Sequence, residues 1–236
     1  MILLVVRTES RRIALTASSI AARFAELPNP TVPSARMLRQ QMSRELRTEP
    51  APFVIGVAFR LISTVAVPKW FTYELLNKHP EALARLTPAQ VQMLGQGMAS
   101  WGEVDAFACY IAGPAWRQDC VGTADIRRWA ESPDPWWRRA ALVSTVPLNN
   151  TARGGSSDAD RTLLVCDLLK NDRDEMVVKA LSWALRELAK KQPRTVEMYL
   201  KTQEGQLAPR VVREVRNKLT TGLKNPGPNR RNEPCD

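Results

Sequence analysis

An aspartate and two tryptophans are the side chains in this sequence whose spacing first indicates chemistry. Trp101 and Asp105 stand four residues apart, so on a helix they project from one face about one turn apart. Trp183 lies on a later helical segment and could supply a second aromatic wall. An indole face attracts a cationic group, and a nearby carboxylate stabilises positive charge that develops in a transition state. On a helix these residues can flank a single substrate group, and their types suit a group that carries or develops positive charge.

Each of these residue types also has a purely structural interpretation. A tryptophan at helical spacing is more often part of the core, and a lone aspartate is more often solvated or a helix cap. Asp105 lies beside Val104, Ala106 and Phe107 on an otherwise apolar helix, which argues against a solvated surface residue without a role. We keep the structural interpretation for the other tryptophans that we considered, which are Trp70, Trp116, Trp129 and Trp136.

Basic side chains suit a polyanionic partner. The 236 residues contain 34 Lys and Arg against 24 Asp and Glu, a formal charge of +10, and nucleic acid is the first candidate for such an excess. Arg139 could hold a phosphate by two parallel hydrogen bonds, with Lys179 and Arg186 adding affinity for the backbone that does not depend on base sequence. The stripe of Arg210, Arg213 and Arg216 fits DNA contact and a solvated outer face equally well.

Cysteine and histidine usage argues against a metal site. Cys109, Cys120, Cys166 and Cys235 are far apart, and the only histidine is His79, so zinc-ligand spacing is absent. We therefore expect no metal and no cofactor, with reduced thiols in a cytoplasmic protein.

The opening MILLVV is too short for a signal peptide, and no apolar run has the length of about 18 residues that a membrane span needs.

The segments that carry these residues have helical patterns. Thr87 is predicted to cap a helix that has Pro88 at its first position, and Ser34 is predicted to cap another. Predicted helices of about 11 to 18 residues with short connections indicate antiparallel neighbours, and a paired spacing of about 35 to 45 residues is typical of a solenoid. We predict an all-α, HEAT-like helical-repeat solenoid with a concave basic face.

Breaks in the pattern suggest the domain organisation. Residues 1–33 end in the breaker cluster LPNPTVP and are interpreted as an N-terminal segment of unknown role. Residues 34–223 are predicted to form one helical-repeat domain, in which TARGGSSDAD at 151–160 is expected to be a flexible loop. Residues 224–236 are predicted to be a disordered tail.

Three segments together carry a family resemblance: WGEVD at 101–105, WAESPDPWWRRAAL at 129–142 and VVKALSWALRE at 177–187. They resemble the bacterial alkylpurine DNA glycosylases of the HEAT-repeat AlkD family, over roughly residues 50–222. The matching positions are Trp101 and Asp105, then Trp129, Ser132, Trp136 and Arg139, then Lys179, Trp183 and Arg186. The region before residue 50 departs from the family pattern, which leaves the range of lesions open.

The resemblance implies a monofunctional DNA glycosylase of base excision repair. It would hydrolyse the N-glycosidic bond of cationic N3- or N7-alkylated purines in alkylated double-stranded DNA, without flipping the base into a deep pocket. Asp105 would be catalytic, Trp101 and Trp183 would contact the lesion, and Arg139, Lys179 and Arg186 would bind DNA. We expect a monomer that is associated with the bacterial nucleoid and not with a membrane.

Two other functions fit the same sequence. A non-catalytic HEAT-repeat module that binds nucleic acid or damage would bind DNA with a steep salt dependence and release no base. A protein–protein scaffold would keep its partner after loss of Arg139 and Lys179 and would show no affinity for DNA.

Overall fold

The chain is all-helical, as predicted. The computed structural model describes residues 2–28, 31–64 and 66–226, and in these ranges it contains helices and turns without a strand. The arrangement is that of a helical-repeat protein, which confirms the predicted all-α, helical-repeat class, whereas the concave basic face stays a prediction. None of the helices in the described ranges combines the length and the apolar character needed to cross a bilayer.

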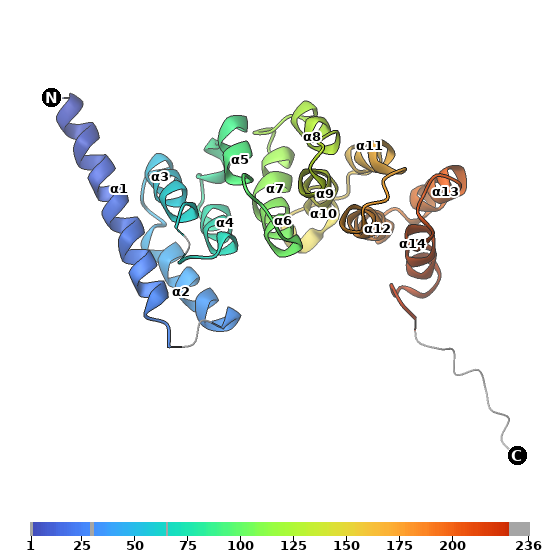
Figure 1. Ribbon diagram of the computed structural model, residues 1–236, viewed down its shortest axis with the longest axis horizontal. Coiled ribbons are helices and arrows are strands. Elements are labelled where there is room, and N and C mark those ends of the chain that lie inside the picture. The colour runs from blue at the N-terminus through green and yellow to red at the C-terminus, as the bar shows by residue number, and fades with distance from the viewer. Residues whose placement is uncertain (1, 29–30, 65, 227–236) are drawn as a thin grey trace, which may run out of the picture. The chain divides into compact units, whose positions relative to one another are not determined.

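The chain divides into two compact units, Met1–Asp125 and Ile126–Asp236. The division falls inside the range 34–223 that the sequence assigned to one domain. The helices of the first unit (Figure 1) are α1 (Ile2–Ala25), α2 (Val32–Glu45), α3 (Ala51–Ile62), α4 (Lys69–Lys78), α5 (Pro88–Leu94), α6 (Trp101–Phe107) and α7 (Gly113–Arg117). The helix α8 (Thr123–Ala130) spans the division, and α9 (Pro135–Val143), α10 (Val146–Asn149), α11 (Ala159–Leu169), α12 (Glu175–Ala189), α13 (Pro193–Gln203) and α14 (Pro209–Thr221) come after it.

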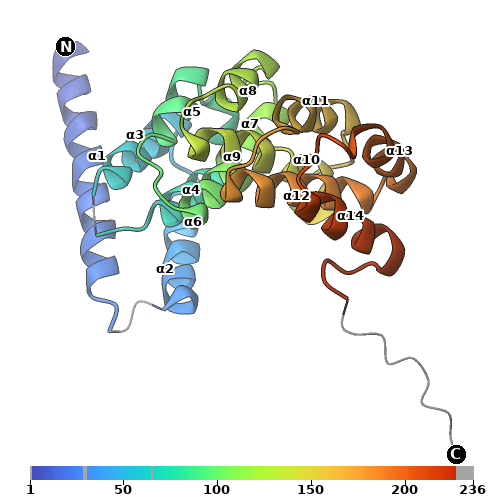
Figure 2. The same cartoon turned by 45° about the vertical axis from the view of Figure 1, so that its right-hand side comes forward.

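The first helix is packed into the first unit. Ala17, Ile20 and Phe24 recur at helical spacing along α1 and are buried, and α1 lies against both α2 and α3 (Figure 2). The ring of Phe24 meets that of Phe71 edge to face at 5.6 Å. Most of the segment 1–33 is thus part of the helical array and does not stand apart from it.

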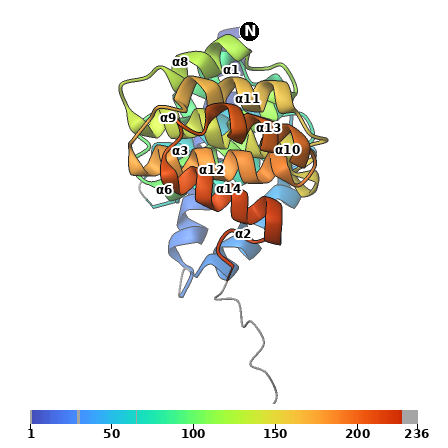
Figure 3. The same cartoon turned by 90° about the vertical axis from the view of Figure 1, so that its right-hand side faces the viewer.

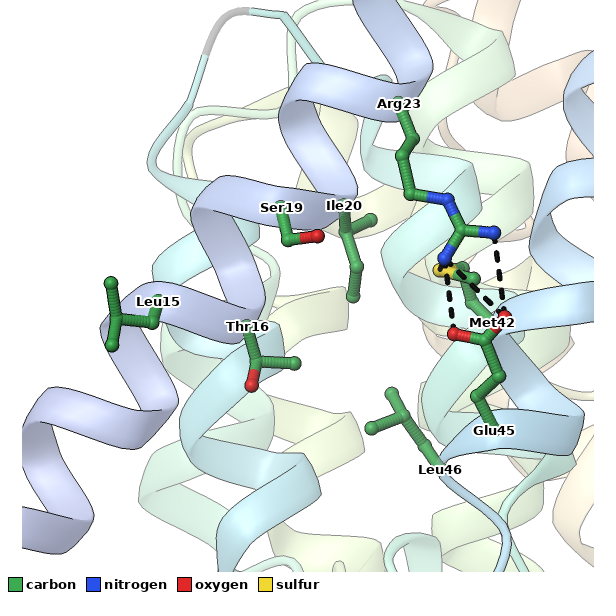
Figure 4. Close-up of a pocket in the computed structure, with 8 residues that line it drawn as sticks. All are labelled: Leu15, Thr16, Ser19, Ile20, Arg23, Met42, Glu45 and Leu46. Atoms are coloured by element: carbon green, nitrogen blue, oxygen red, sulfur yellow. Dashed lines mark hydrogen bonds and ion pairs between the residues drawn. The ribbon is translucent and has the colours of Figure 1, made fainter.

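Polar contacts also tie α1 to α2. Arg23 Nη1 lies 3.0 Å from Glu45 Oε2 at the rim of a small open pocket of about 260 Å³. The pocket is lined by side chains of both helices, and Leu15 points away from Glu45 along its outer edge (Figure 4). All residues that line this pocket precede the three motifs of the family resemblance, which begin at Trp101.

In the second unit, α12 lies at the centre. It contacts α9, α10, α11, α13 and α14, and its buried positions include Val177, Leu181, Ala184 and Leu188 at helical spacing. Figures 1 and 3 show α11 and α13 in one layer and α12 and α14 in the other. Because five helices pack against α12, its backbone is fixed, and so are the positions from which its less buried side chains project.

The loop at residues 151–160 differs from its prediction. Gly155 is buried, and a β-carbon there would lie 2.3 Å from the carbonyl oxygen of Pro147. The Ser157 N–H donates to Leu148 O at 3.1 Å, and the Asp158 N–H donates to Asn149 Oδ1 at 2.8 Å. These hydrogen bonds to α10 fix a segment whose composition suggested flexibility. Of the predicted tail, residues 227–236 lie outside the described residues.

Candidate functional site

The start of α6 is fixed by reciprocal capping. Ser100 is the N-cap residue with φ −145° and ψ 154°, and its Oγ accepts a hydrogen bond from Glu103 N at 3.3 Å. The Glu103 carboxylate accepts one from Ala99 N at 2.9 Å, which satisfies a second backbone donor. Lys69 Nζ of α4 lies 3.7 Å from Glu103 Oε1. The first turn of α6 is therefore fixed by its own cap residues and by the ion pair with α4.

Trp101 and Asp105 share this helix and lie one turn apart. Trp101 is 61% exposed, and among the residues that the structure describes it is the one aromatic side chain in the exposed class. Asp105 is half-buried, whereas its neighbours Val104 and Phe107 are fully buried. The arrangement offers an indole face to a ligand, with a carboxylate held one turn further along the same helix.

Three further predicted residues share one face of α12. Lys179, Trp183 and Arg186 have the i, i+4, i+7 spacing of a helix face and are all half-buried. Lys179 Nζ lies 2.7 Å from Glu175 Oε1. The hydrogen bond and the charge of Lys179 hold the pKa of Glu175 below its ordinary value. Lys179 thus has a local counter-charge that a phosphate would have to replace.

The sequence reasoning missed a buried carboxylate that orients Arg186. Glu214 of α14 is 1% exposed, and its carboxylate accepts hydrogen bonds from Ser182 Oγ at 2.6 Å and Arg210 Nε at 2.8 Å. Arg186 Nε lies 3.9 Å from Glu214 Oε2 and donates to Ser182 Oγ at 3.1 Å. Lys224 Nζ lies 3.6 Å from Glu214 Oε1. We call these five residues the Glu214 cluster.

Protonation in the Glu214 cluster is set by burial and by the neighbouring cations. Burial alone would raise the pKa of Glu214, but the hydrogen bonds from Ser182 and Arg210 and the charges of Lys224 and Arg210 outweigh it, so this pKa lies below its ordinary value. Burial lowers the pKa of Arg186, against the opposing effect of Glu214. The i, i+4 spacings of Ser182 with Arg186 and of Arg210 with Glu214 are present in the sequence of each helix. The two pairs form one cluster only when α12 and α14 pack, which the sequence of neither helix indicates.

Arg139 is a buried arginine and not a surface one. It is 5% exposed, and its Nη1 donates to the carbonyl of Met176 in the first turn of α12 at 2.6 Å. The adjacent Arg138 bonds Asp172 Oδ2 at 2.7 Å and the carbonyl of Ser132 at 3.0 Å. Both arginines hold the ends of helices together, and the DNA contact of Arg139 stays a prediction.

The six predicted site residues fall into two groups. Trp101 and Asp105 belong to the first unit, and Arg139, Lys179, Trp183 and Arg186 belong to the second. Trp101 and Asp105 share α6, Lys179, Trp183 and Arg186 share α12, and Arg139 contacts the first turn of α12. The pairing of Asp105 with Trp183 stays a prediction. In the part of the chain that the structure describes, His, Cys, Asp and Glu side chains do not gather in threes as a metal site requires.

Comparison with known protein families gives a match. The family described as DNA alkylation repair enzyme matches residues 69–219, which is more than half of the chain and includes all six predicted site residues. Searches of curated proteins and of solved structures found nothing similar to the chain. The resemblance inferred from the three motifs is thereby confirmed at the level of the family. With its helical-repeat fold and this match, the chain belongs to the DNA alkylation repair enzyme family.

Proposed function

We propose that the protein is a monofunctional DNA glycosylase that hydrolyses the N-glycosidic bond of N3- or N7-alkylated purines in duplex DNA. The observation that carries the proposal is the exposed indole of Trp101, one turn from the half-buried carboxylate of Asp105 on a firmly capped helix. In a family of DNA alkylation repair enzymes, this pair suits a cationic base and the sugar that holds it.

The chemistry needs only these two groups and water. Alkylation at N3 or N7 makes the purine cationic, which weakens the glycosidic bond and favours contact with an indole face. The bond between C1′ and the base nitrogen breaks, and its electron pair neutralises the base. Positive charge moves to the sugar, where the Asp105 carboxylate stabilises it. Water then adds to C1′ and loses a proton, which leaves an abasic sugar and an intact strand.

Cations of the second unit would supply affinity for the DNA backbone. Lys179 and Arg186 lie half-buried on one face of α12, and Arg139 anchors the first turn of that helix. In the proposal they belong to a concave basic face on which Trp183 meets the lesion. The enzyme would act as a monomer in the cytoplasm, on DNA of the nucleoid.

Base release from duplex DNA that contains N7-methylguanine tests the proposal. Asp105→Asn removes the charge at nearly constant volume, and we expect release under single-turnover conditions to fall by about 10²–10³-fold, the usual effect of losing one transition-state contact. Asp160→Asn is the matched control, because Asp160 is an exposed aspartate in the first turn of α11. We expect this control to release base at the wild-type rate.

Two outcomes would contradict the proposal. If Asp105→Asn releases base as fast as the wild type, the assigned role of the carboxylate is wrong. If the wild type binds DNA with a steep salt dependence but releases no base, the protein is a damage-binding module and not a glycosylase.

A further inference from the structure

The helical run that carries Trp101 and Asp105 is not one regular α-helix. Residues Ala108–Ala112 form a π-turn between α6 and α7, in which the Gly113 N–H donates to the Ala108 carbonyl five residues back. Such a turn accommodates one residue more than an α-turn, and π-turns are frequent near functional sites. Here the π-turn begins three residues after Asp105.

Pro114 explains why the run needs this turn. Proline has no N–H to donate to the carbonyl four residues back, and its ring collides with that carbonyl in a regular helix. The carbonyl concerned is that of Tyr110. In the structure it accepts a hydrogen bond from Asn77 Nδ2 of α4 at 2.8 Å. A side chain from a neighbouring helix thus supplies the donor that Pro114 lacks.

The π-turn changes where Asp105 points. In a regular α-helix, Asp105 would share a face with Ala112 and Trp116 at i+7 and i+11. Ala112 is 0% exposed and Trp116 is 1% exposed, so that face lies in the core. One extra residue rotates α6 by about 100° relative to α7. Asp105 is accordingly half-buried, and Trp101 reaches solvent.

We infer that Asn77 is a positioning residue: its hydrogen bond to the Tyr110 carbonyl holds the π-turn in the register that presents Trp101 and Asp105 at the surface. The helix α4 packs against both α6 and the π-turn, so the donor is carried by a fixed neighbour. The effect of Asn77 on base release rests on the proposed function. The effect of Asn77 on the stability of the π-turn does not.

Amide hydrogen exchange tests the turn without using activity. Removing one hydrogen bond with Asn77→Ala should speed exchange in residues 108–117 by about three- to tenfold. Pro114→Ala restores an N–H that can bond the Tyr110 carbonyl, so in that background the effect of Asn77→Ala should fall below twofold. Asn150→Ala is the matched control, because Asn150 Nδ2 bonds Glu187 Oε1 at 2.9 Å in the second unit. It should leave exchange in residues 108–117 unchanged.

Base release tests whether the turn acts through Asp105. At saturating methylated DNA, Asn77→Ala should slow release by about three- to tenfold, as expected for one lost hydrogen bond. In the Asp105→Asn background the same change should have less than a twofold effect, because no carboxylate remains to be aligned. A general loss of folded protein would slow release equally in both backgrounds, and that result would overturn the positioning role.

The exchange experiment keeps the inference separate from the proposed function. If the wild type releases no base, the glycosylase proposal fails, but faster exchange in Asn77→Ala still supports the hold of Asn77 on the turn. If exchange in residues 108–117 is the same in wild type, Asn77→Ala and Asn150→Ala, the inference is wrong whatever the activity.

Discussion

Two tryptophans on one helical run differ completely in their surroundings. Trp101 is 61% exposed in the first turn of α6. Trp116, in α7, is 1% exposed, and its Nε1 donates to Thr123 Oγ1 at 3.2 Å. A buried indole with a satisfied N–H is a core residue, whereas an exposed indole contributes little to folding. Trp101 is therefore the tryptophan whose loss should affect a ligand and not the fold.

We expect opposite results from the two tryptophan variants. Trp101→Ala should change the free energy of unfolding by less than about 1 kcal/mol, because the surface site loses few packing contacts. It should still weaken lesion binding or slow base release. Trp116→Ala should cost about 3–5 kcal/mol, as large core deletions do. Urea unfolding measures both values, and a large loss of stability in Trp101→Ala would show that its indole packs against the protein.

At the scale of elements, the packing of α12 against α14 explains how Arg186 is oriented. Glu214 is buried between the helices, and its carboxylate lies within 4 Å of Arg186, Arg210 and Lys224. Three cations around one carboxylate leave the cluster with a surplus of positive charge. That surplus would favour an approaching phosphate once Arg186 is held in place.

The lowered pKa of Glu214 predicts a pH dependence of stability. Because this carboxyl holds its proton less tightly in the folded chain, the unfolded chain binds more protons at acid pH. The stabilisation is therefore present above the ordinary glutamate pKa of about 4.3 and is lost as the pH falls through the lower pKa of the folded state. Glu214→Gln should lower the free energy of unfolding at pH 7 by about 2 kcal/mol and flatten its fall in acid.

Urea unfolding between pH 3 and pH 7 checks this prediction. Glu197→Gln is the matched control, because Glu197 is exposed on α13. Equal acid sensitivity in wild type and Glu214→Gln would show that other carboxylates dominate the acid unfolding of this protein.

At the scale of the whole molecule, positive charge is not confined to the part that matches the family. The first 68 residues precede the match and contain nine arginines against four glutamates, with neither lysine nor aspartate. They carry about half of the formal charge of +10. Any DNA affinity should therefore draw on residues outside the family match as well as on those inside it.

The dependence of DNA affinity on salt tests the backbone contacts. Each phosphate contact that is lost should reduce the slope of log K against log salt by about 0.9. Lys179→Gln should reduce the slope by that amount and weaken binding to damaged and undamaged duplexes alike. Lys201→Gln is the control, because Lys201 is exposed on α13, in the layer opposite to α12. An unchanged slope in Lys179→Gln would remove Lys179 from the proposed DNA-binding face.

Local features of the fold were predictable where the signal lies within a few residues. Thr87 caps α5 with Pro88 at its first turn, as predicted, because cap and turn residues interact only with each other. The cap predicted at Ser34 was wrong: Thr31 caps α2, and the helix begins at Val32. Threonine and serine are both good caps, so short-range preference did not decide between two candidates three residues apart.

By itself, the sequence determined the all-helical class, the family and the pairing of Trp101 with Asp105 on one helix face, because each depends on spacing along the chain. Tertiary structure alone decided the burial of Arg139, the Glu214 cluster and the hydrogen bond from Asn77 to the Tyr110 carbonyl. The bonds from Arg139 to Met176, from Ser182 to Glu214 and from Asn77 to Tyr110 each join residues more than 30 positions apart. In each of them the donor and the acceptor meet only after their helices have packed.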